Sequence, residues 1–78
     1  MQIERTSWGI LLKTVRINRG LKLRDLAEMS GVSANQISKV ENGTAEPTEF
    51  SKAKIAKALG MKVAELFPYD VYPGGDAR

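Results

Sequence analysis

Two helical patterns follow one another between residues 23 and 42, with almost no chain between them. Gly31 is suited to end the first, because a left-handed C-terminal cap strongly favours glycine. Ser33 is suited to begin the second, because its hydroxyl can accept a hydrogen bond from an amide of the first turn. Two helices joined by a short glycine-containing turn, with apolar residues on their inner faces, form a helix-turn-helix unit.

Helical periodicity continues on both sides of this unit, and the sustained alternation of a β-strand is nearly absent. The predicted helices cover residues 7–19, 23–30, 34–42, 49–59 and 62–67. We therefore predict an all-α fold, a bundle of five short helices.

The apolar residues of each predicted helix fall largely on one face, which we expect to line the core. They are Trp8, Leu11, Leu12 and Val15 in the first helix, Leu23, Leu26, Ala27 and Met29 in the second, Ile37 and Val40 in the third, and Phe50, Ala53, Ile55, Ala56 and Leu59 in the fourth. Trp8 is expected in the core or as a lid over it. Lys52, Lys54 and Lys57 are expected to form a solvated face.

Composition excludes several classes of function. The 78 residues suffice for one domain, predicted over residues 1–78, and include no cysteine and no histidine. A disulfide framework and thiol or imidazole metal sites are therefore excluded, and the acids are scattered singly, without a catalytic pair. We expect no enzymatic activity, no metal and no cofactor. Apolar stretches are too short to span a membrane, so we expect a cytoplasmic protein without a membrane partner.

The first turns of the third helix carry small or polar side chains, which no stability argument requires. They are Ala34, Asn35, Gln36, Ser38 and Lys39. A helix enters the major groove of DNA only if its exposed tip is slim and carries hydrogen-bonding groups, and this tip meets both conditions. The net charge of +3, from 12 Lys and Arg against 9 Asp and Glu, makes an anionic partner plausible.

The stretch "LRDLAEMSGVSANQISKVENG" resembles the phage-repressor/Cro-like (XRE-type) helix-turn-helix family, which includes the lambda-repressor-like fold. The matching features are Leu-Ala in the second helix, Gly-Val-Ser at the turn, Ile-Ser in the third helix and Glu-Asn-Gly at its end. The segments "WGILLKTVRINRGL" and "IAKALGMKVAELF" are similar to the family's first and closing helices. The resemblance covers residues 8–67.

The resemblance implies a role for individual residues. Base contacts are expected from Ala34, Asn35 and Lys39, with Gln36 and Ser38 close by, and phosphate contacts from Ser33, Asn42 and Thr44. Arg16 and Glu41 fall where the family pairs a helix-one arginine with a helix-three glutamate, so a structural ion pair is expected.

The chain departs from the family pattern at two places. Where the family often has a Thr or Ser cap followed by Gln, this chain has Lys22 and Leu23, so Lys22 or Arg24 is expected to contact a phosphate by charge instead. In the fourth helix, Glu49 and Lys52 occupy positions that are usually apolar. Either this helix is rotated locally or its large side chain, Phe50, serves another surface.

The function implied by the resemblance is that of a sequence-specific regulator of transcription that binds double-stranded DNA. We expect a homodimeric repressor with a palindromic operator, whose dimer surface comes from the fifth helix and residues 68–78. Tyr69 and Tyr72 in this tail are expected either to cover the core or to build the dimer interface. The alternative is an antitoxin-like module that binds a partner protein. No small-molecule effector is expected.

Overall fold

The computed structural model describes the backbone of residues 3–68 and the side chains of residues 8–68. Its helices are α1 (Ile3–Asn18), α2 (Leu23–Ser30), α3 (Ala34–Glu41), α4 (Glu49–Ala58) and α5 (Val63–Leu66). Residues 3–68 contain five helices and no strand, so the predicted all-α bundle of five helices is confirmed. The predicted tail contacts of Tyr69 and Tyr72 lie outside the described residues.

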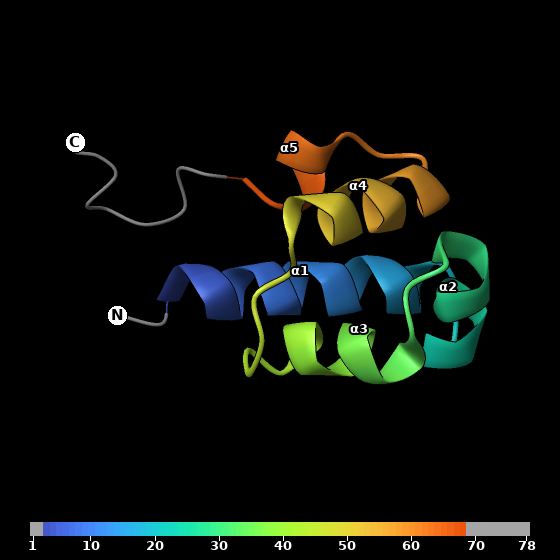
Figure 1. Cartoon of the computed structure of the whole chain (residues 1–78), viewed down its shortest axis with the longest axis horizontal. Coiled ribbons are helices and arrows are strands. Elements are labelled where there is room, and N and C mark those ends of the chain that lie inside the picture. Colours follow the sequence, from blue (N-terminus) through green and yellow to red (C-terminus); the bar gives the residue numbers. More distant parts are fainter. Residues whose placement is uncertain (1–2, 69–78) are drawn as a thin grey trace.

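The other four helices are arranged around α1, which runs through the middle of the molecule (Figure 1). Helix α3 lies along one side of α1, while α4 and α5 lie along the other. The short helix α2 crosses the end of the bundle and contacts both α3 and α4. Within the helix-turn-helix unit, α3 is therefore supported by α1, the longest helix of the fold, whereas α2 packs against α3 and α4.

One predicted helix boundary is wrong by several residues. The first helix begins at Ile3 rather than at Ser7. Residues 3–6 contain neither glycine nor proline, so nothing prevents the helix from extending back through Ser7, which becomes an interior residue. The other predicted boundaries agree with the structure to within one residue.

The turn between α2 and α3 has the predicted caps. Gly31 is left-handed, with a φ of 80°, and its amide donates to the Ala27 carbonyl at 2.8 Å. Ser33 has an extended backbone, and its Oγ accepts a hydrogen bond from the Gln36 amide at 3.1 Å. Val32, between them, is 7% exposed and anchors the turn in the core. Local chemistry therefore fixes the end of one helix and the start of the next.

A single core receives side chains from all five helices. Its fully buried members are Leu12, Leu26, Ile37, Ile55, Leu66 and Phe67. Trp8 belongs to this core: its ring meets Phe67 edge to face, with centroids 5.8 Å apart, and its Nε1 donates to the Pro68 carbonyl at 2.8 Å. The inward faces predicted for α1 and α3 are confirmed, whereas Met29 of α2 is half exposed.

The inward face predicted for α4 is wrong in part. Ile55, Ala56 and Leu59 are buried, but Phe50 is 71% exposed, and Ala53 is also exposed. Positions 52, 55, 56 and 59 recur at the spacing of one helical face, and Phe50 falls on the opposite side. Phe50 therefore serves another surface, where the Lys54 ammonium lies 4.4 Å from the centre of its ring.

Lys52, rather than Phe50, faces the core at the start of α4. The prediction of a solvated face is therefore wrong for Lys52. It is 4% exposed, and its Nζ lies 4.3 Å from the centre of the Trp8 indole and 3.2 Å from Glu49 Oε2. A lysine can bury its aliphatic stem while its ammonium remains paired, and the face of an aromatic ring attracts the charge.

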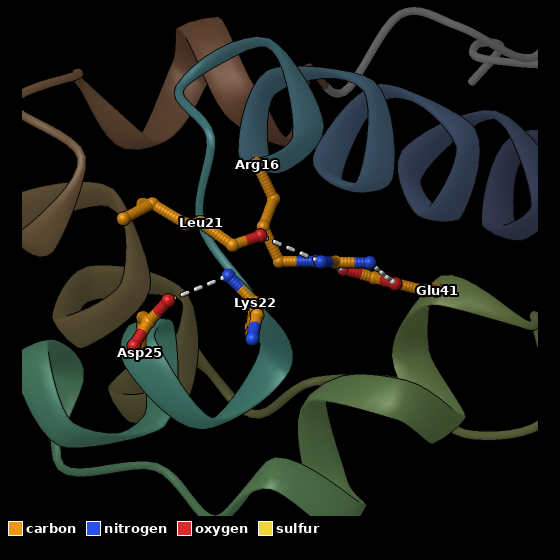
Figure 2. A network of polar contacts seen from close by, with 5 residues as sticks. All are labelled: Arg16, Leu21, Lys22, Asp25 and Glu41. Carbon is orange, nitrogen blue, oxygen red and sulfur yellow. Dashed lines mark hydrogen bonds and ion pairs between the residues drawn. The ribbon is translucent and has the colours of Figure 1, made fainter.

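A buried ion pair fastens α1 to the end of α3 (Figure 2). Arg16 Nε and Nη2 donate to the two carboxylate oxygens of Glu41 at 2.7 and 3.1 Å, and Nη1 donates to the Leu21 carbonyl at 2.8 Å. The Glu41 side chain is only 4% exposed. The hydrogen bonds to Glu41 and its negative charge raise the pKa of Arg16 above its ordinary value, against the opposing effect of burial. One guanidinium thus joins α1, the α1–α2 connection and α3.

We expect Arg16→Met to lower the free energy of unfolding by about 3–5 kcal/mol, because the Glu41 carboxylate would then be buried without a cation. Urea denaturation at low temperature measures this loss. Lys13→Met, at an exposed position of the same helix, is the matched control and should change little. The double variant Arg16→Met/Glu41→Leu should recover most of the loss. A loss below about 1 kcal/mol for Arg16→Met would contradict this account of the pair.

Candidate nucleic-acid interface

The exposed side of α3 presents the polar residues that the sequence singled out. Asn35, Gln36 and Lys39 are exposed, and Ala34 and Ser38 are half-buried. Ile37 and Val40 hold the opposite side in the core. The helical repeat places Ala34, Asn35, Ser38 and Lys39 in one stripe, with Gln36 about 100° further around the axis from Asn35. The stripe offers one methyl, one amide, one hydroxyl and one ammonium group.

The N-terminal tip of α3 combines a hydroxyl with backbone amides. Ser33 Oγ accepts from the Gln36 amide, which leaves its own hydrogen able to donate outward from an exposed position. The amides of Ala34 and Asn35 belong to the first turn, where helix amides have no acceptor within the helix. Together with the helix dipole, this arrangement favours a phosphate oxygen.

Two basic side chains lie at the start of α2, and Arg24 shares a surface depression with Ser33 at the tip of α3. Lys22 and Arg24 are exposed, and the Lys22 amide donates to Asp25 Oδ2 at 2.8 Å (Figure 2). The backbone donor of Lys22 is therefore used inside the protein, and only its side-chain charge can reach a phosphate. A shallow depression of about 450 Å³ separates α2 from the start of α3, and Arg24, Glu28 and Ser33 are among the residues that line it.

The two residues expected to hold a phosphate after α3 differ in what they can donate. The Thr44 amide and Oγ1 both donate to the Lys39 carbonyl, at 2.9 and 3.1 Å, and so close the end of α3. Asn42 is exposed, and its backbone amide bonds to the Ser38 carbonyl. Of the two, Asn42 has the side chain better placed to donate outward, whereas the Thr44 hydroxyl would first have to leave the Lys39 carbonyl.

Two arginines of the basic run between residues 13 and 24 are held by contacts within the protein. Arg16 is buried against Glu41, and Arg19 Nη1 donates to the Leu59 carbonyl at 2.5 Å, where it satisfies the end of α4. The exposed cations of the helix-turn-helix unit and its first cap are therefore Lys22, Arg24 and Lys39.

One residue of structural importance was missed by the sequence reasoning. Gly9 is buried in the middle of α1, where it lies against the carbonyls of Val40 and Glu41 at the end of α3. A lone glycine inside an amphipathic helical pattern is the signal that could have identified it.

No helix within residues 3–68 is long and apolar enough to cross a membrane.

Comparison with known proteins identifies the class of this chain. The helix-turn-helix family HTH_3 matches residues 12–66. An uncharacterized HTH-type transcriptional regulator of Methanocaldococcus jannaschii is 37% identical over 59 residues, which make up 76% of this chain and 89% of that protein.

Two solved structures are similar over most of their length. The clp gene regulator ClgR from Corynebacterium glutamicum has a TM-score of 0.73 and 36% identity, over 81% of this chain and 82% of that chain. The restriction-modification controller protein C.AhdI from Aeromonas hydrophila has a TM-score of 0.76 and 31% identity, over 80% of this chain and 94% of that chain. The chain therefore belongs to the HTH_3 family of helix-turn-helix DNA-binding transcriptional regulators.

Proposed function

We propose that this chain is a homodimeric repressor that reads a palindromic operator by placing α3 in the major groove. The observation that carries the proposal is the exposed stripe of Ala34, Asn35, Ser38 and Lys39 beside a tip of outward-facing donors. A major groove accepts one α-helix, and the width and chemistry of this stripe suit it. A protein seated in that groove at a promoter excludes other proteins from the same DNA, which would repress transcription.

Each side chain of the stripe has a preferred base partner. Asn35 suits adenine, because its side-chain oxygen can accept from the N6 amino group while its side-chain NH2 donates to N7. Lys39 suits the O6 and N7 acceptors of guanine, and the Ala34 methyl suits the methyl group of thymine. Gln36 and Ser38 lie close enough to add contacts. A target of mixed sequence is expected.

The phosphate contacts would come from the tip of α3, from the start of α2 and from the residues that follow α3. Ser33 and the first-turn amides of α3 would bind one phosphate, and Lys22 and Arg24 at the start of α2 would attract the same strand by charge. Asn42 would bind beyond the other end of α3. Thr44 would join it only after its hydroxyl turns from the Lys39 carbonyl.

Dimerisation follows from the size of the domain. We treat residues 8–67 as one DNA-binding unit, because all five helices share one core, and a unit this small contacts only a half-site. A second copy, joined through α5 and residues 68–78, would double the recognised length. Two-fold symmetry then requires half-sites about 34–36 Å apart, one turn of DNA.

Selection from a random duplex library tests this proposal. Purified protein should retain duplexes with a two-fold symmetric motif whose half-sites are centred about one helical turn apart. Binding should weaken steeply between 50 and 200 mM salt, because each neutralised phosphate releases counterions. If a folded protein enriched no sequence, the alternative would take first place: a module of the antitoxin-like kind that binds a partner protein.

Variants of α3 and α2 should affect binding in different ways. Asn35→Ala and Lys39→Ala should relax base discrimination by about 1–3 kcal/mol for each good contact, because they remove groups that read base edges. Arg24→Ala should weaken all sequences alike and reduce the salt slope by about 1, because it removes one phosphate contact.

Quantitative binding to the selected duplex and to single-base variants of it measures both effects. Lys57→Ala, at an exposed position of α4 on the far side of α1, removes an equal charge and is the matched control. An Asn35→Ala/Lys39→Ala variant that kept the preferred sequence of the wild type would contradict the assignment of α3.

A further inference from the structure

At Gly9 the backbone of α1 lies against the backbone at the end of α3. A Cβ atom at this position would lie 2.6 Å from the Val40 carbonyl oxygen, closer still to the Glu41 carbonyl oxygen, and 2.9 Å from the Glu41 carbonyl carbon. All three atoms belong to the backbone at the end of α3, so no side chain can rotate away to make room. Any larger residue must push this end of α3 away from α1.

The reason for glycine here is the absence of a side chain rather than freedom of the backbone. The glycines with positive φ are Gly20, Gly31, Gly43 and Gly60, each after the end of a helix. Gly9 instead lies within α1, where glycine is less stable than alanine because it loses more conformational freedom. A position that accepts this cost is expected to serve a close contact.

Glu41 touches α1 at two separate points. Its carbonyl lies against Gly9, and its carboxylate is held by Arg16 (Figure 2). Gly9 and Arg16 are seven residues apart on the same face of α1, about 10.5 Å along the axis. Two contacts separated in this way restrict both the distance between α1 and α3 and the direction of the α3 axis.

The consequence reaches the other end of α3, because this helix has only eight residues. A shift of its end at Val40 and Glu41 tilts the whole helix and moves Asn35 and Lys39 relative to Arg24 on α2. Hydrogen bonds to base edges depend steeply on distance and angle, whereas attraction between Arg24 and a phosphate does not. A tilt of α3 should therefore damage sequence reading more than general attraction to DNA.

We propose that Gly9 is a positioning residue for DNA recognition, which sets the pose of α3 by admitting its last two carbonyls against α1. This inference rests on the proposed reading of DNA by α3. Gly9 itself contacts no DNA in this account.

Gly9→Ala tests the inference through a ratio of affinities. The probes are the duplex selected by the wild-type protein and a scrambled duplex of equal length, at the same salt concentration. We expect Gly9→Ala to lose affinity for the selected duplex by about tenfold or more, the scale of one or two base contacts, and to lose less than about threefold for the scrambled one. Circular dichroism should show that the helices are retained.

A control separates positioning from a general loss of stability. Ile55→Val shortens a buried side chain on α4, which lies across α1 from α3. Leu59→Val is combined with Ile55→Val where the single variant is more stable than Gly9→Ala, so that the control and Gly9→Ala have the same melting temperature. This control should keep the wild-type ratio of affinities. An equal ratio for Gly9→Ala and the control would overturn the inference.

Other outcomes are also decisive. If Gly9→Ala is partly unfolded, the measurement is repeated in trimethylamine N-oxide, which favours the compact state, and the same ratio is read from the folded protein. A variant that folds under no condition would overturn a positioning role in favour of a purely structural one. If the wild-type protein itself prefers no duplex, the proposed function fails; if only the ratio for Gly9→Ala stays at the wild-type value, only this inference fails.

Discussion

The contact between α1 and the end of α3 is the interaction on which the rest of the structure depends. An eight-residue helix is not stable by itself in water, so α3 takes both its stability and its direction from its neighbours. Ile37 and Val40 supply apolar burial, and Glu41 adds a bidentate ion pair with Arg16. Because the same guanidinium holds the Leu21 carbonyl, the connection that leads into α2 is fixed by the same group. Arg16 of α1 thus fixes both the end of α3 and the connection that leads into α2.

Local chemistry explains why the helix-turn-helix unit could be predicted from the sequence. Gly31 ends α2 in the left-handed conformation, and Ser33 caps α3 with its hydroxyl, and both effects depend on residues within one helical turn. The buried face of α3 also follows from its repeat. The inward face of α4 could not be predicted in this way, because hydrophobicity favours Phe50 over Lys52 as a core residue. In the structure Lys52 is buried, where its ammonium lies near the Trp8 ring and Glu49, and Trp8 is distant in sequence.

The candidate site was predictable in its composition and only partly in its connections. The polar stripe of α3 follows from the residue types and the helical repeat. Two features of the site do not follow from residue types or from the helical repeat. The donors of Thr44 are directed to the Lys39 carbonyl, which depends on how the chain turns after Gly43. A lone glycine in a helical pattern can mark position 9, but its role depends on the approach of two backbones 31 residues apart in the chain, from Gly9 to Val40, which no local pattern describes.

The central claim is that the exposed stripe of α3, held in place by α1, reads DNA. The most direct measurement is a titration of isotopically labelled protein with the selected duplex, followed by the amide and side-chain resonances in nuclear magnetic resonance spectra. The account predicts the largest shifts at Ser33, Asn35 and Lys39, with smaller ones at the start of α2. Shifts concentrated on α4 and α5, with the resonances of α3 unchanged, would contradict it.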